Sequence, residues 1–319
     1  MAGEASVTDR SGSGEAPPTV GRSTGGRPTA GRPRRTLQAY LSLVRFQHTL
    51  FALPFAYAGM WLAAGGPPGW PVFGWVTLAM VGARTFAMAV NRVLDAGIDA
   101  VNPRTAGREI PAGVLTSLDG WALAAVGLAA FVVAGLALNP LTAALLPVAA
   151  LFLALYPLVK RVSWWCHGWL GVTIGAAAAG GWIAVTGAFA APAWWLWLAV
   201  GAWIAGFDVV YALLDRDFDR VHGIHSVPAR FGERTGARIA WGAHALALLA
   251  MLALAPAAGL GWPYLSAVVV VAVVFALQHV WVARHGPEVA LRAFDANLVV
   301  GLVVLAGVVF DQPLRAIGG

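Results

Sequence analysis

Two clusters of acidic and amide side chains each end an apolar segment of this chain, 120 residues apart. The first contains Asn91, Asp95 and Asp99, and the second contains Asp215 and Asp219. Members of a cluster are four residues apart, which places them on one face of a helix. Carboxylates are costly beside a bilayer core, so several of them at the end of a span indicate a functional site. Facing carboxylate stripes suit Mg²⁺, which usually joins carboxylates to substrate phosphates, and we predict a membrane enzyme that handles a diphosphate.

Each cluster has a polar side chain two helical turns deeper in the membrane. Arg84 precedes Asn91 by seven residues and Asp208 precedes Asp215 by seven, so each shares the face of its cluster. Asp208 is either part of the site or a buried aspartate bonded to a neighbouring helix. Asp217 is two residues from Asp215 and should point off the stripe. The predicted metal ligands are Asp95, Asp99, Asp215 and Asp219.

Basic side chains near the clusters are candidates for binding phosphate. Lys160, the only lysine, follows Tyr156 by four residues. It is either a phosphate clamp or part of a basic pair that orients the chain in the membrane. The loop 100–116 adds Arg104 and Arg108, whose guanidinium groups can hold phosphate oxygens. Long loops such as 100–116 and 220–234 are often lids or binding loops.

Two further arginines lie within apolar segments. Arg45 begins the first segment and either extends to the headgroups or faces the site. Arg84 is expensive at its depth unless it has an anionic partner or a polar cavity. We therefore expect Arg45 or Arg84 to pair with a carboxylate on an aromatic substrate.

Composition predicts an all-α polytopic membrane protein. Hydrophobic residues are 59% of the 319, and charged residues only 11%, too few to cover the surface of a soluble domain of this size. About nine segments have the length of about 20 residues that crosses a bilayer. The predicted spans are near 40–64, 71–95, 117–138, 140–159, 165–187, 193–215, 236–257, 263–283 and 291–310.

The distribution of Lys and Arg predicts the topology. The connections near 65–70, 138–140, 187–193 and 257–263 contain neither residue, whereas those on the other side contain several. Positive charge marks the cytoplasmic side, so the acidic clusters and the N-terminus should be cytoplasmic, in the cell membrane. Residues 1–36 lack an apolar run and should form a disordered tail before a membrane domain over 37–319. The net charge of +6 is then a topology signal, and no nucleic-acid partner is expected.

Three motifs resemble those of UbiA-type intramembrane aromatic prenyltransferases. Asn91-Arg-Val-Leu-Asp95-Ala-Gly-Ile-Asp99 and Tyr211-Ala-Leu-Leu-Asp215-Arg-Asp-Phe-Asp219 are similar to the family's paired aspartate motifs. Tyr156 and Lys160 match its Tyr-x-x-x-Lys element. The resemblance covers roughly residues 38–312. It implies nine transmembrane helices around a central cavity, and Mg²⁺-dependent transfer of a prenyl chain from a polyprenyl diphosphate to an aromatic ring.

Within the superfamily, several runs resemble the 4-hydroxybenzoate polyprenyltransferase-like branch. These include Arg108-Glu-Ile-Pro-Ala-Gly113 and the run from Gly223 to Gly232. Many 4-hydroxybenzoate enzymes read Arg-Pro-Leu where this chain reads Arg108-Glu109-Ile110. This departure favours the acceptor of the futalosine route to menaquinone, 1,4-dihydroxy-6-naphthoate, with 4-hydroxybenzoate second. The ring's proton acceptor, the prenyl chain length and the oligomeric state do not follow from the sequence.

Two alternatives remain at this point. The aspartates of an ion-coupled transporter would bind a coupling ion, but such sites usually lie at the bilayer midplane on inverted repeats. Here the clusters lie at one membrane face and end two spans of the same direction. The other alternative is a different prenyl-transfer branch, such as haem O synthesis, chlorophyll synthesis or archaeal lipid ether formation, which shares the motifs.

Overall fold

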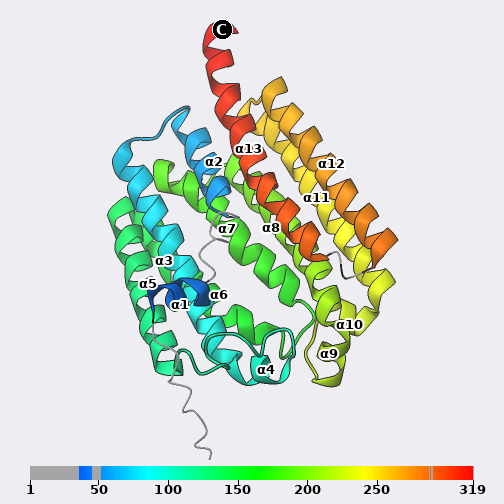
Figure 1. Cartoon of the computed structure of the whole chain (residues 1–319). Helices are drawn as coiled ribbons and strands as arrows, with labels where there is room; N and C mark the ends of the chain where they lie inside the picture. The colour runs from blue at the N-terminus through cyan, green and yellow to red at the C-terminus, as the bar shows by residue number, and fades with distance from the viewer. Residues whose placement is uncertain (1–35, 45–51, 287, 289, 319) are drawn as a thin grey trace, which may run out of the picture. The chain divides into compact units, whose positions relative to one another are not determined.

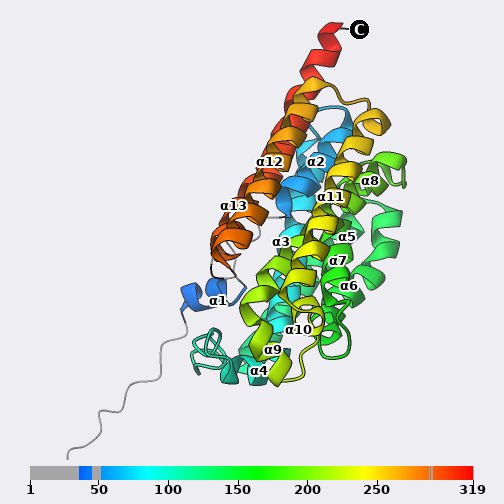
Figure 2. The same cartoon turned by 90° about the vertical axis from the view of Figure 1, so that its right-hand side faces the viewer.

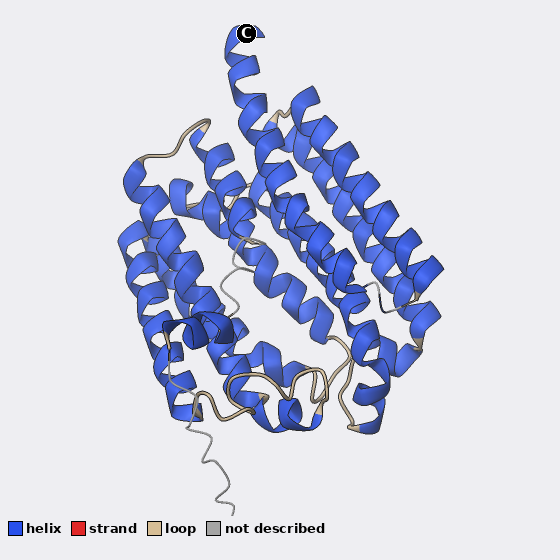
Figure 3. Cartoon of the chain, viewed as in Figure 1, coloured by secondary structure: helices blue, strands red, loops and turns tan. Residues whose placement is uncertain are grey.

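The computed structural model describes residues 36–44, 52–286, 288 and 290–318, without the side chains of 290–296 and 312–318. Every long element in this part of the chain is a helix, as Figure 3 shows. All of it lies in one compact unit, Pro33–Gly319. Arg45 and most of the predicted tail fall outside the described residues.

In the described part of this unit, eight helices of 20 or more residues form the body, and shorter helices connect them or lie at its ends. The long helices are α3 (Trp70–Leu94), α5 (Ser117–Leu138), α6 (Pro140–Val159), α7 (Cys166–Thr186), α8 (Ala191–Ala212), α11 (Glu233–Ala258), α12 (Trp262–His285) and α13 (Ala290–Gly318). The short ones are α1 (Leu37–Leu43), α2 (Leu53–Ala64), α4 (Ala96–Val101), the 3₁₀ turn η2 (Leu213–Asp215), α9 (Arg216–Val221) and α10 (Val227–Phe231).

Seven segments of the described chain are long and apolar enough to cross a membrane: α3, α5, α6, α7, the segment Ala191–Val221, α11 and α12. The chain is therefore a multi-pass membrane protein, as its composition predicts. The predicted first span, 40–64, covers the last part of α1 and all of α2, and residues 45–51 between them are outside the described part of the chain. The predicted ninth span falls within α13, whose described apolar part is Asn297–Asp311.

Helices α7 and α8 are central in the packing. α7 packs against α2 and α8, α8 also packs against α11, and the pairs α3–α5 and α12–α13 add further layers (Figure 1). Trp203 of α8 is fully buried, packs at a tilted angle against Phe55 of α2 with ring centroids 5.0 Å apart, and donates a hydrogen bond of 2.7 Å to Asn297 of α13. This hydrogen bond gives a partner to the indole N–H of Trp203 and to the amide oxygen of Asn297, which are both buried in an apolar core.

Small residues allow α2 and α7 to approach closely. A Cβ atom on Gly181 would lie 2.0 Å from the carbonyl oxygen of Ala56, and one on Gly59 would lie 2.2 Å from that of Ala178. Real side chains cannot occupy these positions, so the contact requires glycine on both helices. The run of small residues in the fifth predicted span therefore serves close helix packing.

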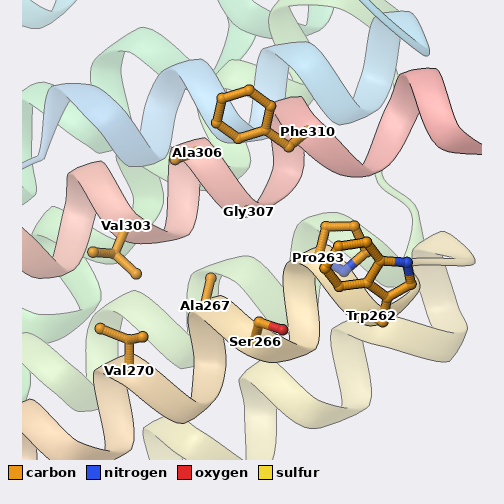
Figure 4. Close-up of a pocket in the computed structure, with 9 residues that line it drawn as sticks. All are labelled: Trp262, Pro263, Ser266, Ala267, Val270, Val303, Ala306, Gly307 and Phe310. Carbon is orange, nitrogen blue, oxygen red and sulfur yellow. The ribbon is translucent and has the colours of Figure 1, made fainter.

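A shallow apolar groove of about 680 Å³ lies between α12 and α13. Its walls include Trp262, Val270, Val303 and Phe310, with Ser266 among the lining residues (Figure 4). This groove is separate from the acidic motifs.

We expect Gly181→Ala to lower the stability of the protein by about 1–3 kcal/mol, because the added methyl group forces α2 away from α7. The matched control is Gly180→Ala, since a Cβ there meets no atom within 4 Å. The melting temperature of each variant is measured by heating the protein in detergent and monitoring the loss of folded protein by size-exclusion chromatography. Equal melting temperatures for the two variants would show that the close approach of α2 and α7 does not limit stability.

Candidate active site

Both acidic motifs lie where a long helix is interrupted. α3 ends at Leu94, Asp95 lies between it and α4, and Asp99 is in the first turn of α4. The helical hydrogen bonds nonetheless continue from the Asp95 N–H to the Asn91 carbonyl at 2.9 Å, and from the Asp99 N–H to the Asp95 carbonyl at 2.8 Å. The four-residue spacing therefore still stacks these side chains across the interruption.

The second motif follows the same plan. α8 passes into the turn η2, which ends at Asp215, and then into α9. Asp219 of α9 is buried, whereas the side chain of Asp217 is 80% exposed. α4, α9 and α10 gather at one end of the unit in both views (Figures 1 and 2). The two motifs are thus at the same end of their spans, and Asp217 points away from the stripe.

Asp95 is the most buried carboxylate of the first motif, at 1% exposure. Lys160 at the end of α6 forms an ion pair with its Oδ2, and Arg161 approaches Oδ1 at 3.4 Å. The Asn91 amide donates to Oδ2 at 3.0 Å. A carboxylate this deep requires such donors, because an unpaired buried charge is very costly.

Asp99 is paired with an arginine of the following loop. Both of its oxygens accept from Arg108 Nη1, at 2.6 and 2.7 Å, and Arg92 Nη1 lies 4.0 Å from Oδ2. Arg92 Nε also donates to the Leu43 carbonyl of α1 at 3.2 Å. Asp99 thus joins the loop to Arg92 of α3, and Arg92 in turn bonds α1.

Asp215 forms a bidentate pair with Arg104. Nε of Arg104 donates to Oδ1 at 2.8 Å, Nη2 donates to Oδ2, and Nη1 donates to the Tyr211 hydroxyl at 2.8 Å. Asn102 adds a hydrogen bond of 3.3 Å to Oδ1. Burial opposes the charge of Arg104, but its hydrogen bonds and the nearby negative charge of Asp215 raise the pKa of the guanidinium overall. The loop of the first motif is thereby joined to the second motif.

The loop after the second motif is held to the same centre. Asp219 accepts from the Ser226 hydroxyl at 2.8 Å, and the His225 N–H donates to the Lys160 carbonyl at 2.7 Å. Ser226 also caps α10 through the N–H of Ala229. These bonds place the 222–226 loop beside Lys160.

Three other predicted residues have different positions. Asp208 is bonded to His167 of α7, with 2.6 Å between Oδ2 and Nδ1. Tyr156 lies in α6, one helical turn before Lys160. Arg84 is partly buried in α3, two turns above Asn91, as its spacing predicts.

Sequence reasoning gave no role to four members of this network, Arg92, Asn102, His167 and Ser226, and considered Arg161 only as the other half of the basic pair with Lys160. Arg92 and Arg161 are adjacent to predicted residues, and their charge was the available signal. His167 could have been noticed as a polar residue near the start of an otherwise apolar span. Asn102 and Ser226 were not predicted to be bonded to Asp215 and Asp219.

The donor chemistry at this end of the unit suits a hard divalent cation. Asp95, Asp99, Asp215 and Asp219 supply oxygen ligands of the type Mg²⁺ binds. Within the described residues, no three acidic, histidine or cysteine side chains converge as a metal site. Three of these carboxylates are instead paired with Lys160, Arg108 and Arg104.

A multi-pass helical protein with buried, cation-paired carboxylates at one end of its spans has the features of an intramembrane enzyme with a charged substrate group. The model of the UbiA prenyltransferase family matches residues 52–301. The chain belongs to this family and is an aromatic prenyltransferase.

Curated relatives share most of their length with this chain. The 4-hydroxybenzoate octaprenyltransferase of Cupriavidus metallidurans is 32% identical over 275 residues, covering 85% of this chain and 93% of that protein. The enzyme of the same name from Hydrogenovibrio crunogenus is 32% identical over 295 residues, covering 87% and 98%.

Solved structures show the same fold. The apo structure of a UbiA homologue from Aeropyrum pernix has a TM-score of 0.77 at 32% identity, covering 83% of this chain and 98% of that one. A UbiA homologue from Archaeoglobus fulgidus, bound to GPP and Mg²⁺, has a TM-score of 0.63 at 16% identity, covering 85% and 99%.

We expect Asp95→Asn and Asp215→Asn each to lower kcat by at least about 100-fold, because removing a carboxylate removes charge stabilisation of several kcal/mol. Asp217→Asn is the matched control, since its exposed side chain pairs only with Arg216 in the described structure. The kcat of each of the three variants is measured as prenyl transfer by detergent-purified protein, with the product quantified by mass spectrometry. If either of the first two variants turned over at a near-normal rate at saturating Mg²⁺, that aspartate would not be part of the site.

Proposed function

We propose that this chain transfers a polyprenyl group from a polyprenyl diphosphate to an aromatic acid, in a Mg²⁺-dependent step of quinone biosynthesis. The observation that carries the proposal is the gathering of both acidic motifs with Lys160, Arg104 and Arg108 at one end of an apolar helical unit. Diphosphate needs cations, and a prenyl chain needs an apolar environment. This end of the unit supplies both.

We infer that the acidic motifs and the N-terminal tail face the cytoplasm, in the cell membrane. Every predicted loop that carries Lys or Arg lies on this side, in agreement with the positive-inside rule. The proposed architecture is nine spans around a central cavity. Its first and last spans would include the residues between α1 and α2 and the beginning of α13.

The basic side chains of the site can pair with two kinds of anion: the carboxylates of the protein and the diphosphate of the substrate. In the free protein they pair with Asp95, Asp99 and Asp215. Diphosphate oxygens compete for the same ammonium and guanidinium groups, and Arg is well matched to phosphate geometry. We propose that Lys160, Arg104 and Arg108 exchange carboxylate partners for the diphosphate when the substrate binds.

The carboxylates that are released would then be free to bind metal. Asp95, Asp99, Asp215 and Asp219 would hold Mg²⁺, which when bound supplies positive charge against the leaving diphosphate. Tyr211, whose hydroxyl accepts from Arg104, would keep that guanidinium oriented. The apolar helices exclude water, which would otherwise quench an allylic cation.

The proposed acceptor is 1,4-dihydroxy-6-naphthoate, with 4-hydroxybenzoate as the second candidate. The curated relatives are named for the second compound, whereas the Arg108-Glu109-Ile110 run favours the first. Glu109 is hydrogen-bonded to Ser42 of α1. The difference from the Arg-Pro-Leu sequence of many 4-hydroxybenzoate enzymes therefore occurs where the 100–116 loop contacts α1. Both acceptors carry a carboxylate, for which Arg45 and Arg84 are the proposed partners.

Family membership favours prenyl transfer over ion-coupled transport. Haem O synthesis, chlorophyll synthesis and archaeal lipid ether formation are disfavoured by the 4-hydroxybenzoate relatives. The substrates of the proposed reaction are a polyprenyl diphosphate and an aromatic acid, and no nucleic acid takes part.

A direct competition assay tests the acceptor. Purified protein with Mg²⁺ and a long-chain prenyl diphosphate receives equal amounts of both acids, together with their decarboxylated analogues. We expect prenylated 1,4-dihydroxy-6-naphthoate to predominate, the analogues to react poorly, and EDTA to stop all transfer. Preference for 4-hydroxybenzoate would reverse the order of acceptors. Equal reaction of the decarboxylated compounds, unchanged in Arg84→Ala, would refute carboxylate recognition by Arg84.

A further inference from the structure

A hydrogen-bonded pair joins α7 to α8 on the membrane side of the second motif. His167 Nδ1 lies 2.6 Å from Asp208 Oδ2, and His167 Nε2 accepts a hydrogen bond of 3.1 Å from the backbone N–H of Val227. With Nε2 as the acceptor from Val227, the ring nitrogen that can donate to Asp208 is Nδ1. Asp208 therefore accepts from His167 as a carboxylate.

Asp208 keeps one oxygen available. Its side chain is 28% exposed, whereas that of His167 is 6% exposed. Within the described part of the chain, its bonds are those to His167 through Oδ2. Oδ1 is therefore open to a ligand or to water, while Oδ2 is fixed.

The pair has two different sides. His167 lines an apolar groove of about 440 Å³ between α7, α8 and α11, together with Trp164, Trp197 and Val227. Asp208 is not among the described residues that line this groove. His167 thus faces the groove, whereas its partner Asp208 lies on the membrane side of the second motif, seven residues before Asp215.

The depth of Asp208 matches the position required of the acceptor ring. Asp208 precedes Asp215 by seven residues, or roughly 10 Å along a helix. A diphosphate held by Arg104 and Lys160 leaves its allylic carbon on the membrane side. The diphosphate and its cations occupy the mouth side of the allylic carbon, so the ring that bonds to this carbon lies deeper than the diphosphate.

We propose that Asp208 accepts the proton that the aromatic ring loses, and that His167 is the positioning residue that orients it. This inference rests on the proposed function. The bond between the allylic carbon and oxygen breaks, and the diphosphate leaves with the electron pair. The ring carbon bonds to the allylic carbon, its C–H bond then breaks, and those electrons restore aromaticity. The proton passes to Asp208 Oδ1 and afterwards to water at the mouth of the site.

His167 suits this role because it is fixed from both sides. The Val227 N–H, in the first turn of α10, holds Nε2 as an acceptor, which keeps the proton on Nδ1. The hydrogen bond from Nδ1 then orients Asp208 while leaving it ionised. A carboxylate fixed through one oxygen can present the other as a general base.

Asp208→Asn tests the base directly, since it preserves shape and removes basicity. We expect kcat to fall about 100-fold or more, a typical contribution of general base catalysis, while the KM for geranyl diphosphate stays within about twofold of wild type. The acceptor is 4-hydroxybenzoate or 1,4-dihydroxy-6-naphthoate, deuterated at the reacting ring carbon. Loss of the ring proton should become rate-limiting in the variant, which then shows a primary isotope effect that the wild type lacks. A raised KM for geranyl diphosphate without an isotope effect would overturn the assignment.

Two substitutions at His167 separate positioning from packing. His167→Asn keeps an N–H donor for Asp208 and should retain most of the activity, whereas His167→Ala should lower kcat and show the isotope effect. Equal losses in both variants, with no isotope effect in either, would make His167 structural. Wild-type protein that prenylates neither acid would refute the proposed function. Normal wild-type transfer with no isotope effect in Asp208→Asn would refute only the role of Asp208.

Discussion

The site depends on the electrostatic neutralisation of carboxylates at the end of an apolar helical unit. Ionised carboxylates are stable at low exposure only when cations and hydrogen-bond donors surround them. Asp99 pairs with Arg108, Asp95 with Lys160 and Asp215 with Arg104. These pairs also determine the architecture, because Arg104 connects the loop after α4 to the end of α8, and Lys160 connects the end of α6 to that of α3. The same cations are the groups that a diphosphate needs.

Much of this arrangement could be predicted from the sequence. The spans follow from runs of apolar residues, and the separation of buried Asp219 from exposed Asp217 follows from helical periodicity. The stripe of Asn91, Asp95 and Asp99 also survives the break between α3 and α4, because the helical hydrogen bonds continue through it. The family motifs predicted the reaction type, which the relatives bear out.

The pairings could not be predicted, because they join residues far apart in the sequence. Arg104 and Asp215 are 111 residues apart, and nothing local distinguishes Arg104 from Arg108 as the partner of Asp215. The sequence left two alternatives open for Asp208: a role in the site, or a hydrogen bond to a neighbouring helix. It does bond to a neighbouring helix, at His167; the polarity of His167 within an apolar span was visible, but no local spacing indicates its partner on another helix.

In the proposed mechanism, Lys160, Arg104 and Arg108 occupy the carboxylates until a diphosphate binds. Calorimetric titration of Mg²⁺ into Arg104→Gln, without any prenyl diphosphate, tests it most directly. Removing the partner of Asp215 frees a carboxylate and removes a competing charge. We therefore predict that Mg²⁺ binds this variant about tenfold more tightly than wild type, a difference of about 1.4 kcal/mol, while a non-reactive prenyl diphosphate analogue binds more weakly. Unchanged or weaker binding of Mg²⁺ to Arg104→Gln would contradict the account.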